Sequence, residues 1–219
     1  MEPIALSQAA PRRLRLIKAV LLAVSLLPLV RLAVLAATDS LGANPVEFIT
    51  RSTGTWTLVL LLCTLAITPL RRFTGLGWLI RLRRLLGLVS FAYAVLHALT
   101  WVWLDQWFDP RAMLTDIMQR PFVTAGFVAV LLMLPLALTS TDAMMRRLGR
   151  RWAKLHRVVY LVLAASLLHY WWHKQGKNDL LEPALYALVA GVLMSARWLT
   201  GKSRSSANSD STVSRSRMR

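Results

Sequence analysis

One apolar run of this chain, residues 85–104, reads LLGLVSFAYAVLHALTWVWL and contains a histidine, His97. Five further apolar runs accompany it, at residues 19–37, 56–70, 122–138, 155–172 and 183–199. Each run approaches the roughly 20 residues with which a helix crosses about 30 Å of hydrocarbon. None alternates polar and apolar residues with period two, as the strands of a barrel do. The sequence therefore predicts an all-α integral membrane protein, a six-helix transmembrane bundle.

The composition supports this assignment. Hydrophobic residues make up 56% of the 219 positions and charged residues 17%, whereas roughly a quarter of the residues in soluble domains are charged. The six runs place a membrane domain at residues 19–199, behind a basic N-terminus at residues 1–18. Residues 200–219 are rich in Ser and Arg with almost no apolar side chains, which predicts a disordered basic tail.

Charged residues predict the orientation of the bundle. The N-terminus, the second and fourth connections between runs and the C-terminal segment hold 21 of the 27 Lys and Arg residues. The alternate connections hold seven of the ten acidic residues, which are Asp39, Glu47, Asp105, Asp109, Asp116, Asp179 and Glu182. By the positive-inside rule, both termini are expected to be cytoplasmic. Because the net charge of +17 is spread along the membrane boundary, the expected partner is anionic lipid and not nucleic acid.

Two features exclude other classes of protein. Arg12 and Arg13 precede the first run as in a twin-arginine signal, but that run contains Arg31 and five more runs follow it. We therefore expect no cleaved signal peptide. Cys63 is the only cysteine, which excludes a disulfide, an iron–sulfur cluster and a covalently attached heme.

Three of the four histidines lie inside predicted spans, where an imidazole needs a partner. At 1.5 Å per residue, His97 lies roughly 18 Å along the third span from its cytoplasmic end, and His169 lies about 20 Å beyond His156 in the fifth. His97 and His169 should therefore lie at similar depth, as the two axial ligands of a b-type heme do. Either residue alone could instead bond a neighbouring helix, and His173 is expected at the outer interface.

The inner histidine, His156, has an arginine at its own depth. Arg83 lies 14 residues before His97 and so returns to nearly the same helix face. In a two-heme arrangement, Arg83 would bind heme propionates or approach the iron; alternatively, it only anchors the helix at the cytoplasmic boundary. The 13 residues between His156 and His169 correspond to about 140° on an ideal helix, which does not suit two hemes against one face.

The segments around these histidines resemble the MsrQ (YedZ) family of heme-binding membrane subunits. The similar segments are residues 83–88 (RRLLGL) with His97, 139–141 (TST), 148–149 (LG), 151–152 (RW), 155–156 (LH) and 169–170 (HY). The loop at residues 41–46 (LGANPV) and the span exit at residues 67–70 (ITPL) fit the same pattern. The resemblance covers roughly residues 15–200.

The resemblance implies a multi-pass electron-transfer subunit of the bacterial inner membrane, within the ferric-reductase-like transmembrane superfamily. Such subunits hold heme b, with flavin mononucleotide (FMN) also attributed to the family. They take electrons from membrane quinones and pass them to a periplasmic molybdopterin subunit, MsrP, which reduces methionine sulfoxide in oxidised proteins. By motif position, the iron ligands are His97, His156 and His169. The sequence leaves open whether one heme or two are bound.

The residues themselves add one expectation to the resemblance. No glycine-rich dinucleotide loop follows a strand, so electrons must come from a lipid-soluble donor or a separate reductase. No acid–base pair or activated nucleophile occurs either, so we expect an electron-transfer subunit and not an enzyme. Two alternatives are a stand-alone ferric-reductase-like cytochrome and a heme-free transporter. The transporter is suggested only by Pro28 with Arg31 and by Pro135.

Overall fold

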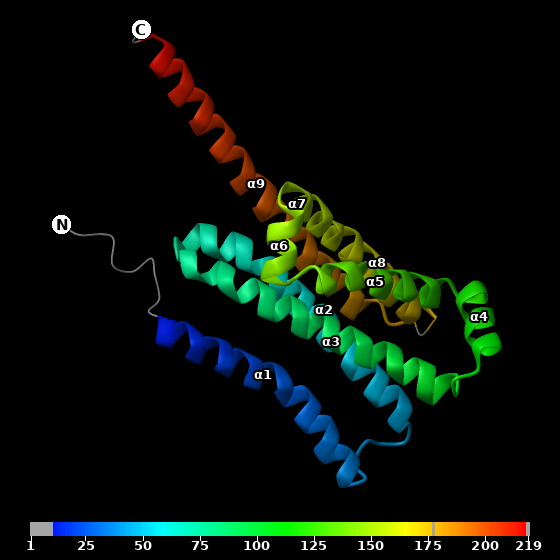
Figure 1. The fold of residues 1–219 in the computed structure, drawn as a ribbon. Helices are drawn as coiled ribbons and strands as arrows, with labels where there is room; N and C mark the ends of the chain where they lie inside the picture. Colours follow the sequence, from blue (N-terminus) through cyan, green and yellow to red (C-terminus); the bar gives the residue numbers. More distant parts are fainter. Residues whose placement is uncertain (1–10, 177, 218–219) are drawn as a thin grey trace.

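The computed structural model describes residues 11–176 and 178–217, with side chains described up to residue 199. Every regular element within these residues is a helix, as the sequence predicts (Figure 1). The long elements are α1 (Pro11–Ala37), α2 (Pro45–Thr74), α3 (Arg83–Thr100), α5 (Pro121–Leu138), α8 (Val159–Gln175) and α9 (Leu181–Arg217). The short ones are η1 (Gly77–Leu82), η2 (Trp101–Asp105), α4 (Pro110–Gln119), α6 (Asp142–Leu148), α7 (Arg150–Leu155) and η3 (His156–Val158).

Four of the described segments are long and apolar enough to cross a membrane, namely Pro11–Ala37, Pro45–Thr74, Gly77–Asp105 and Pro121–Leu138. They correspond to the first four predicted spans. The fifth and sixth predicted spans fall in α8, which has 17 residues, and in the first half of α9. The chain is thus a helical membrane protein. The predicted N-terminal residues 1–10 lie outside the described residues, and the predicted disorder of the basic tail stays a prediction.

Helix α2 begins and ends at clear sequence signals. Asn44 caps its N-terminus by accepting a hydrogen bond from the Glu47 amide at 3.1 Å, and Pro45 occupies the first turn. Gly75 ends it in the left-handed conformation, with φ of 71°. The helix therefore starts eleven positions before the apolar run at Trp56, and its first three turns carry polar residues.

The bundle is built from two helix pairs, α2 with α3 and α5 with α8, which meet where α3 packs on α5 (Figure 1). Leu65 of α2 and Val162 of α8 are fully buried in the core between the pairs. Helix α1 packs on α2 and α3, where the Tyr93 hydroxyl donates a hydrogen bond to the Ser25 carbonyl at 2.6 Å. Helices α1 and α5 continue through Pro28 and Pro135 as single helices, without the broken segment that a transporter site would use.

Candidate functional site

The structure brings His97 of α3 and His169 of α8 together. Their ring centroids are 5.8 Å apart and their ring planes cross at 77°. The predicted proximity of these two residues, 72 positions apart in the sequence, is therefore confirmed. Their role as iron ligands stays a prediction.

Each imidazole is held by a backbone carbonyl of the neighbouring helix. His97 donates its Nδ1–H to the carbonyl oxygen of Thr50 on α2, at 3.0 Å. His169 donates its Nδ1–H to the carbonyl oxygen of Phe122 on α5, at 2.7 Å. Because a carbonyl oxygen can only accept, the Nδ1 atoms carry the protons. In the neutral rings, the Nε2 atoms are then left with lone pairs that can bind a metal.

A glycine one turn after each carbonyl lets the ring lie against bare backbone. A Cβ atom built on Gly54 of α2 would lie 2.9 Å from Cε1 of His97, and one on Gly126 of α5 would lie 2.7 Å from Nδ1 of His169. Both distances are shorter than a carbon atom tolerates. The two helix pairs thus use the same device: a carbonyl that orients the imidazole, and a glycine four residues later that makes room for it.

The pair fits the axial ligands of a heme. With metal–imidazole bonds of about 2.0 Å on each side, the two ring centroids of such a pair lie about 6 Å apart, close to the spacing observed here. The Thr50 Oγ1 atom beside this site is buried and has no hydrogen-bond partner among the described residues, so it can bond a polar group of a cofactor. Two imidazoles suit a metal whose other ligands come from a porphyrin.

The fourth histidine lies closer to this pair than an interfacial residue was expected to lie. His173 is one turn beyond His169, with ring centroids 6.5 Å apart and planes within 15°. Its ring also meets Phe122 edge-on, at 5.4 Å. Phe122 therefore contacts both histidines of α8 and separates His173 from the carbonyl that holds His169.

The inner histidine lies in a separate group, away from the His97–His169 pair. His156 stacks on Trp152, with ring centroids 3.9 Å apart, and its Nδ1 lies 3.3 Å from the Trp152 carbonyl oxygen. Arg83 is close enough to interact electrostatically with His156 and with Tyr160. Arg197 donates hydrogen bonds to the Tyr160 hydroxyl at 2.9 Å and to the Thr68 hydroxyl at 2.7 Å. We call Arg83, His156, Tyr160 and Arg197 the inner cluster.

The 140° offset between His156 and His169 disappears because the two residues do not share one regular helix. His156 begins the 3₁₀ turn η3, which joins α7 to α8, and α8 starts only at Val159. A 3₁₀ turn advances three residues per turn, so the angle counted on an ideal α-helix does not apply. The break leaves His156 free to take an orientation of its own.

Residues 53–167 match the family model described as ferric reductase like transmembrane component, which spans more than half of the chain. This match places the chain among the ferric-reductase-like transmembrane proteins. No solved structure matches it.

The chain is also similar to three proteins named protein-methionine-sulfoxide reductase heme-binding subunit MsrQ. The one from Ralstonia nicotianae is 57% identical over 192 residues, which cover 87% of this chain and 88% of that protein. The one from Herminiimonas arsenicoxydans is 53% identical, with 86% and 87% covered, and the one from Bordetella pertussis is 55% identical, with 86% and 93% covered. The chain therefore belongs to the MsrQ family, as its resemblance predicted.

The inner cluster gives the first testable prediction. Replacing His156 with alanine should remove or alter the spectrum of an inner heme and spare most of the signal that depends on the His97–His169 pair. Arg83→Ala should change the same component in the same direction, because Arg83 lies within electrostatic range of His156. Low-temperature spectra of the reduced proteins would separate the two components. If both variants kept the spectrum of the unmodified protein, the inner cluster would have no part in heme binding.

Proposed function

We propose that this chain carries electrons across a bacterial inner membrane through heme b bound between His97 and His169. The observation that carries the proposal is the pair of imidazoles 5.8 Å apart, each with its Nδ1–H bonded to a carbonyl. Bound heme supplies a one-electron redox centre. The name of the MsrQ relatives, heme-binding subunit, supports the assignment.

The side chains around the iron would fix its two imidazole ligands. The carbonyls of Thr50 and Phe122 hold the rings in one orientation, and Gly54 and Gly126 let them approach the helix backbone. Such hydrogen bonds raise the basicity of the ligating nitrogen and fix its direction. A second heme at His156 would place its propionates beside Arg83 of the inner cluster.

We further propose six spans with both termini cytoplasmic, so that the two groups of residues lie at different depths. The inner cluster would lie near the cytoplasm, among basic residues. The His97–His169 pair would lie in the outer half, beside the acidic connections. Anionic lipids would contact the basic boundary.

The electron donor would be a membrane quinol and the acceptor a periplasmic molybdopterin subunit, MsrP. The relatives' name supports a role in reducing protein methionine sulfoxide. On this proposal, the chain is an electron-transfer subunit and its partner carries the catalytic centre. FMN, attributed to the family, stays a prediction. A stand-alone ferric-reductase-like cytochrome would use the same pair without that partner.

The proposal predicts both a spectrum and a donor. The purified protein in detergent should show a heme Soret band and, when reduced, low-spin b-type bands. Adding a ubiquinol or menaquinol analogue should produce the reduced bands without any soluble flavin reductase. A folded, heme-supplemented sample without Soret absorbance would contradict the heme assignment. If only a nicotinamide-driven flavin reductase reduced the heme, the quinol donor would be wrong.

A further inference from the structure

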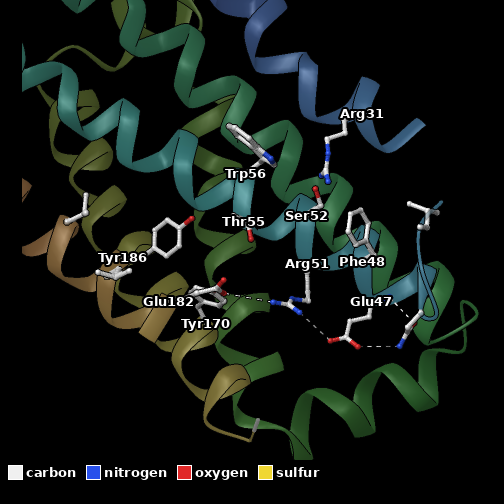
Figure 2. Close-up of a pocket in the computed structure, with 14 residues that line it drawn as sticks. Arg31, Glu47, Phe48, Arg51, Ser52, Thr55, Trp56, Tyr170, Glu182 and Tyr186 are labelled. Carbon is white, nitrogen blue, oxygen red and sulfur yellow. Dashed lines mark hydrogen bonds and ion pairs between the residues drawn. The ribbon is translucent and has the colours of Figure 1, made fainter. Parts of the chain in front are cut away.

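A cavity of about 760 Å³ lies among α1, α2, α8 and α9, within the size range of small-molecule sites (Figure 2). It is lined by Arg31 of α1, by residues of the first three turns of α2, by Tyr170 of α8 and by the first turns of α9. The sequence analysis noted Arg31 alone among these residues, and the heme proposal uses none of them.

The cavity adjoins the His97–His169 pair through two helices. On α2, Gly54 meets the His97 ring, and the next residue, Thr55, lines the cavity. On α8, His169 faces the pair, and the next residue, Tyr170, lines the cavity. A ligand in the cavity would thus lie at the depth of the proposed heme, with one helix wall between them.

Three hydroxyl groups in the lining have no hydrogen bond to any described residue. They belong to Ser52 and Thr55 on α2 and to Tyr186 on α9. Figure 2 shows the Tyr186 hydroxyl directed toward Thr55. Each hydroxyl can both donate and accept, so a ligand with oxygen atoms on a ring gains partners here that the protein does not supply.

The charges in the lining cancel. Arg51 lies 3.9 Å from Glu47 and 3.9 Å from Glu182, and these two carboxylates balance Arg51 and Arg31 (Figure 2). Hydrogen bonds from the Tyr170 hydroxyl, at 2.6 Å, and from Lys174 lower the pKa of Glu182, so it is an anion at neutral pH. A balanced lining favours an uncharged polar ligand over a phosphate.

The remaining lining is apolar or aromatic. Phe48 and Trp56 of α2 offer flat faces, and the Arg31 guanidinium lies over the Phe48 ring at 5.5 Å. Leu185 and Val189 of α9 extend this apolar surface, and they are 53% and 47% exposed on the outside of the bundle. In a membrane, that side faces lipid. The lining therefore fits a flat ring with oxygen substituents and an apolar tail.

We propose that this cavity binds the ring of a membrane quinol, which assigns a site to the donor named under the proposed function and rests on that function. A quinol bound there becomes a quinone by losing two electrons, which ferric heme accepts one at a time, and two protons, which are released to water. Ser52, Thr55 and Tyr186 would bond the ring oxygens, and the apolar face of α9 would hold the tail.

Photolabelling of the holoprotein in lipid nanodiscs tests the site. An azido-ubiquinone analogue should label peptides that contain residues 47–56 or 182–189, and unlabelled decylubiquinone should compete. Thr55→Val and Tyr186→Phe each remove one hydroxyl and should raise the half-saturating concentration about threefold to tenfold. Thr115→Val is the matched control, because Thr115 bonds only its own helix α4, through the Arg111 carbonyl. Its labelling should equal that of the unmodified protein.

Three results would overturn the site. They are labelling confined to other peptides, labelling that neither cavity variant weakens, and labelling displaced by phosphatidylglycerol but not by decylubiquinone. Heme absorbance measured in the same samples separates this outcome from failure of the proposed function. Quinol that reduces the heme while labelling other peptides would refute only the cavity site. Cavity labelling without any quinol-driven heme reduction would support the site and refute the donor.

Discussion

Alanine at either His97 or His169 is expected to remove the same heme from the purified protein. The two rings lie 5.8 Å apart on different helices, and each would supply one of the two imidazoles that low-spin iron needs. Loss of residues that only support a ligand lowers metal affinity about tenfold to a hundredfold, and loss of the ligand itself should cost at least as much. We therefore expect the heme-to-protein ratio of that component to fall at least about tenfold in both variants.

The pyridine hemochrome assay and the Soret band measure this ratio, with circular dichroism to confirm that the helices persist. His173→Ala is the matched control on α8. His173 stacks beside His169, but Phe122 separates it from the carbonyl that holds the ligand ring. This variant should keep most of the heme. If it lost as much as His169→Ala, or if His97→Ala lost none, the ligand assignment would have to be abandoned.

The sequence predicted the paired histidines because depth in a membrane helix follows directly from residue number. With a rise of 1.5 Å per residue, a counting error of one or two residues changes the depth little. Helix face is less tolerant, since each residue turns the helix by about 100°. The 3₁₀ turn at residues 156–158 therefore invalidated the angle between His156 and His169 without affecting the depth of either.

Hydropathy could not find Gly54, Thr50 or the cavity. The predicted second span began at Trp56, because polar residues interrupt the apolar pattern before it. In the structure, α2 begins at Pro45, and those polar residues face His97 or the cavity instead of lipid. One signal was present: Asn44 followed by Pro45 is a helix start. The cavity itself needs four helices, and their arrangement is a property of tertiary packing.

Alanine at Gly126 or Gly54 should weaken heme binding almost as much as loss of a ligand. The new methyl group would lie 2.7 Å from Nδ1 of His169 or 2.9 Å from Cε1 of His97. Each ring is tied to a carbonyl on that same helix, so it cannot move away and keep its hydrogen bond. We expect heme affinity to fall about tenfold or more, with the remaining heme partly high-spin.

Two other helical glycines supply matched controls for that result. A Cβ atom on Gly191 of α9 meets nothing within 4 Å, and one on Gly87 of α3 lies 3.6 Å from the Thr64 methyl group, an ordinary contact. Alanine favours a helix over glycine by about 0.5–1 kcal/mol, so none of the four substitutions should destabilise the helix itself. Heme loss at residues 54 and 126 alone would locate the effect at the imidazoles. Full heme content and an unchanged low-spin spectrum in Gly126→Ala and Gly54→Ala would show that the rings do not need the bare backbone.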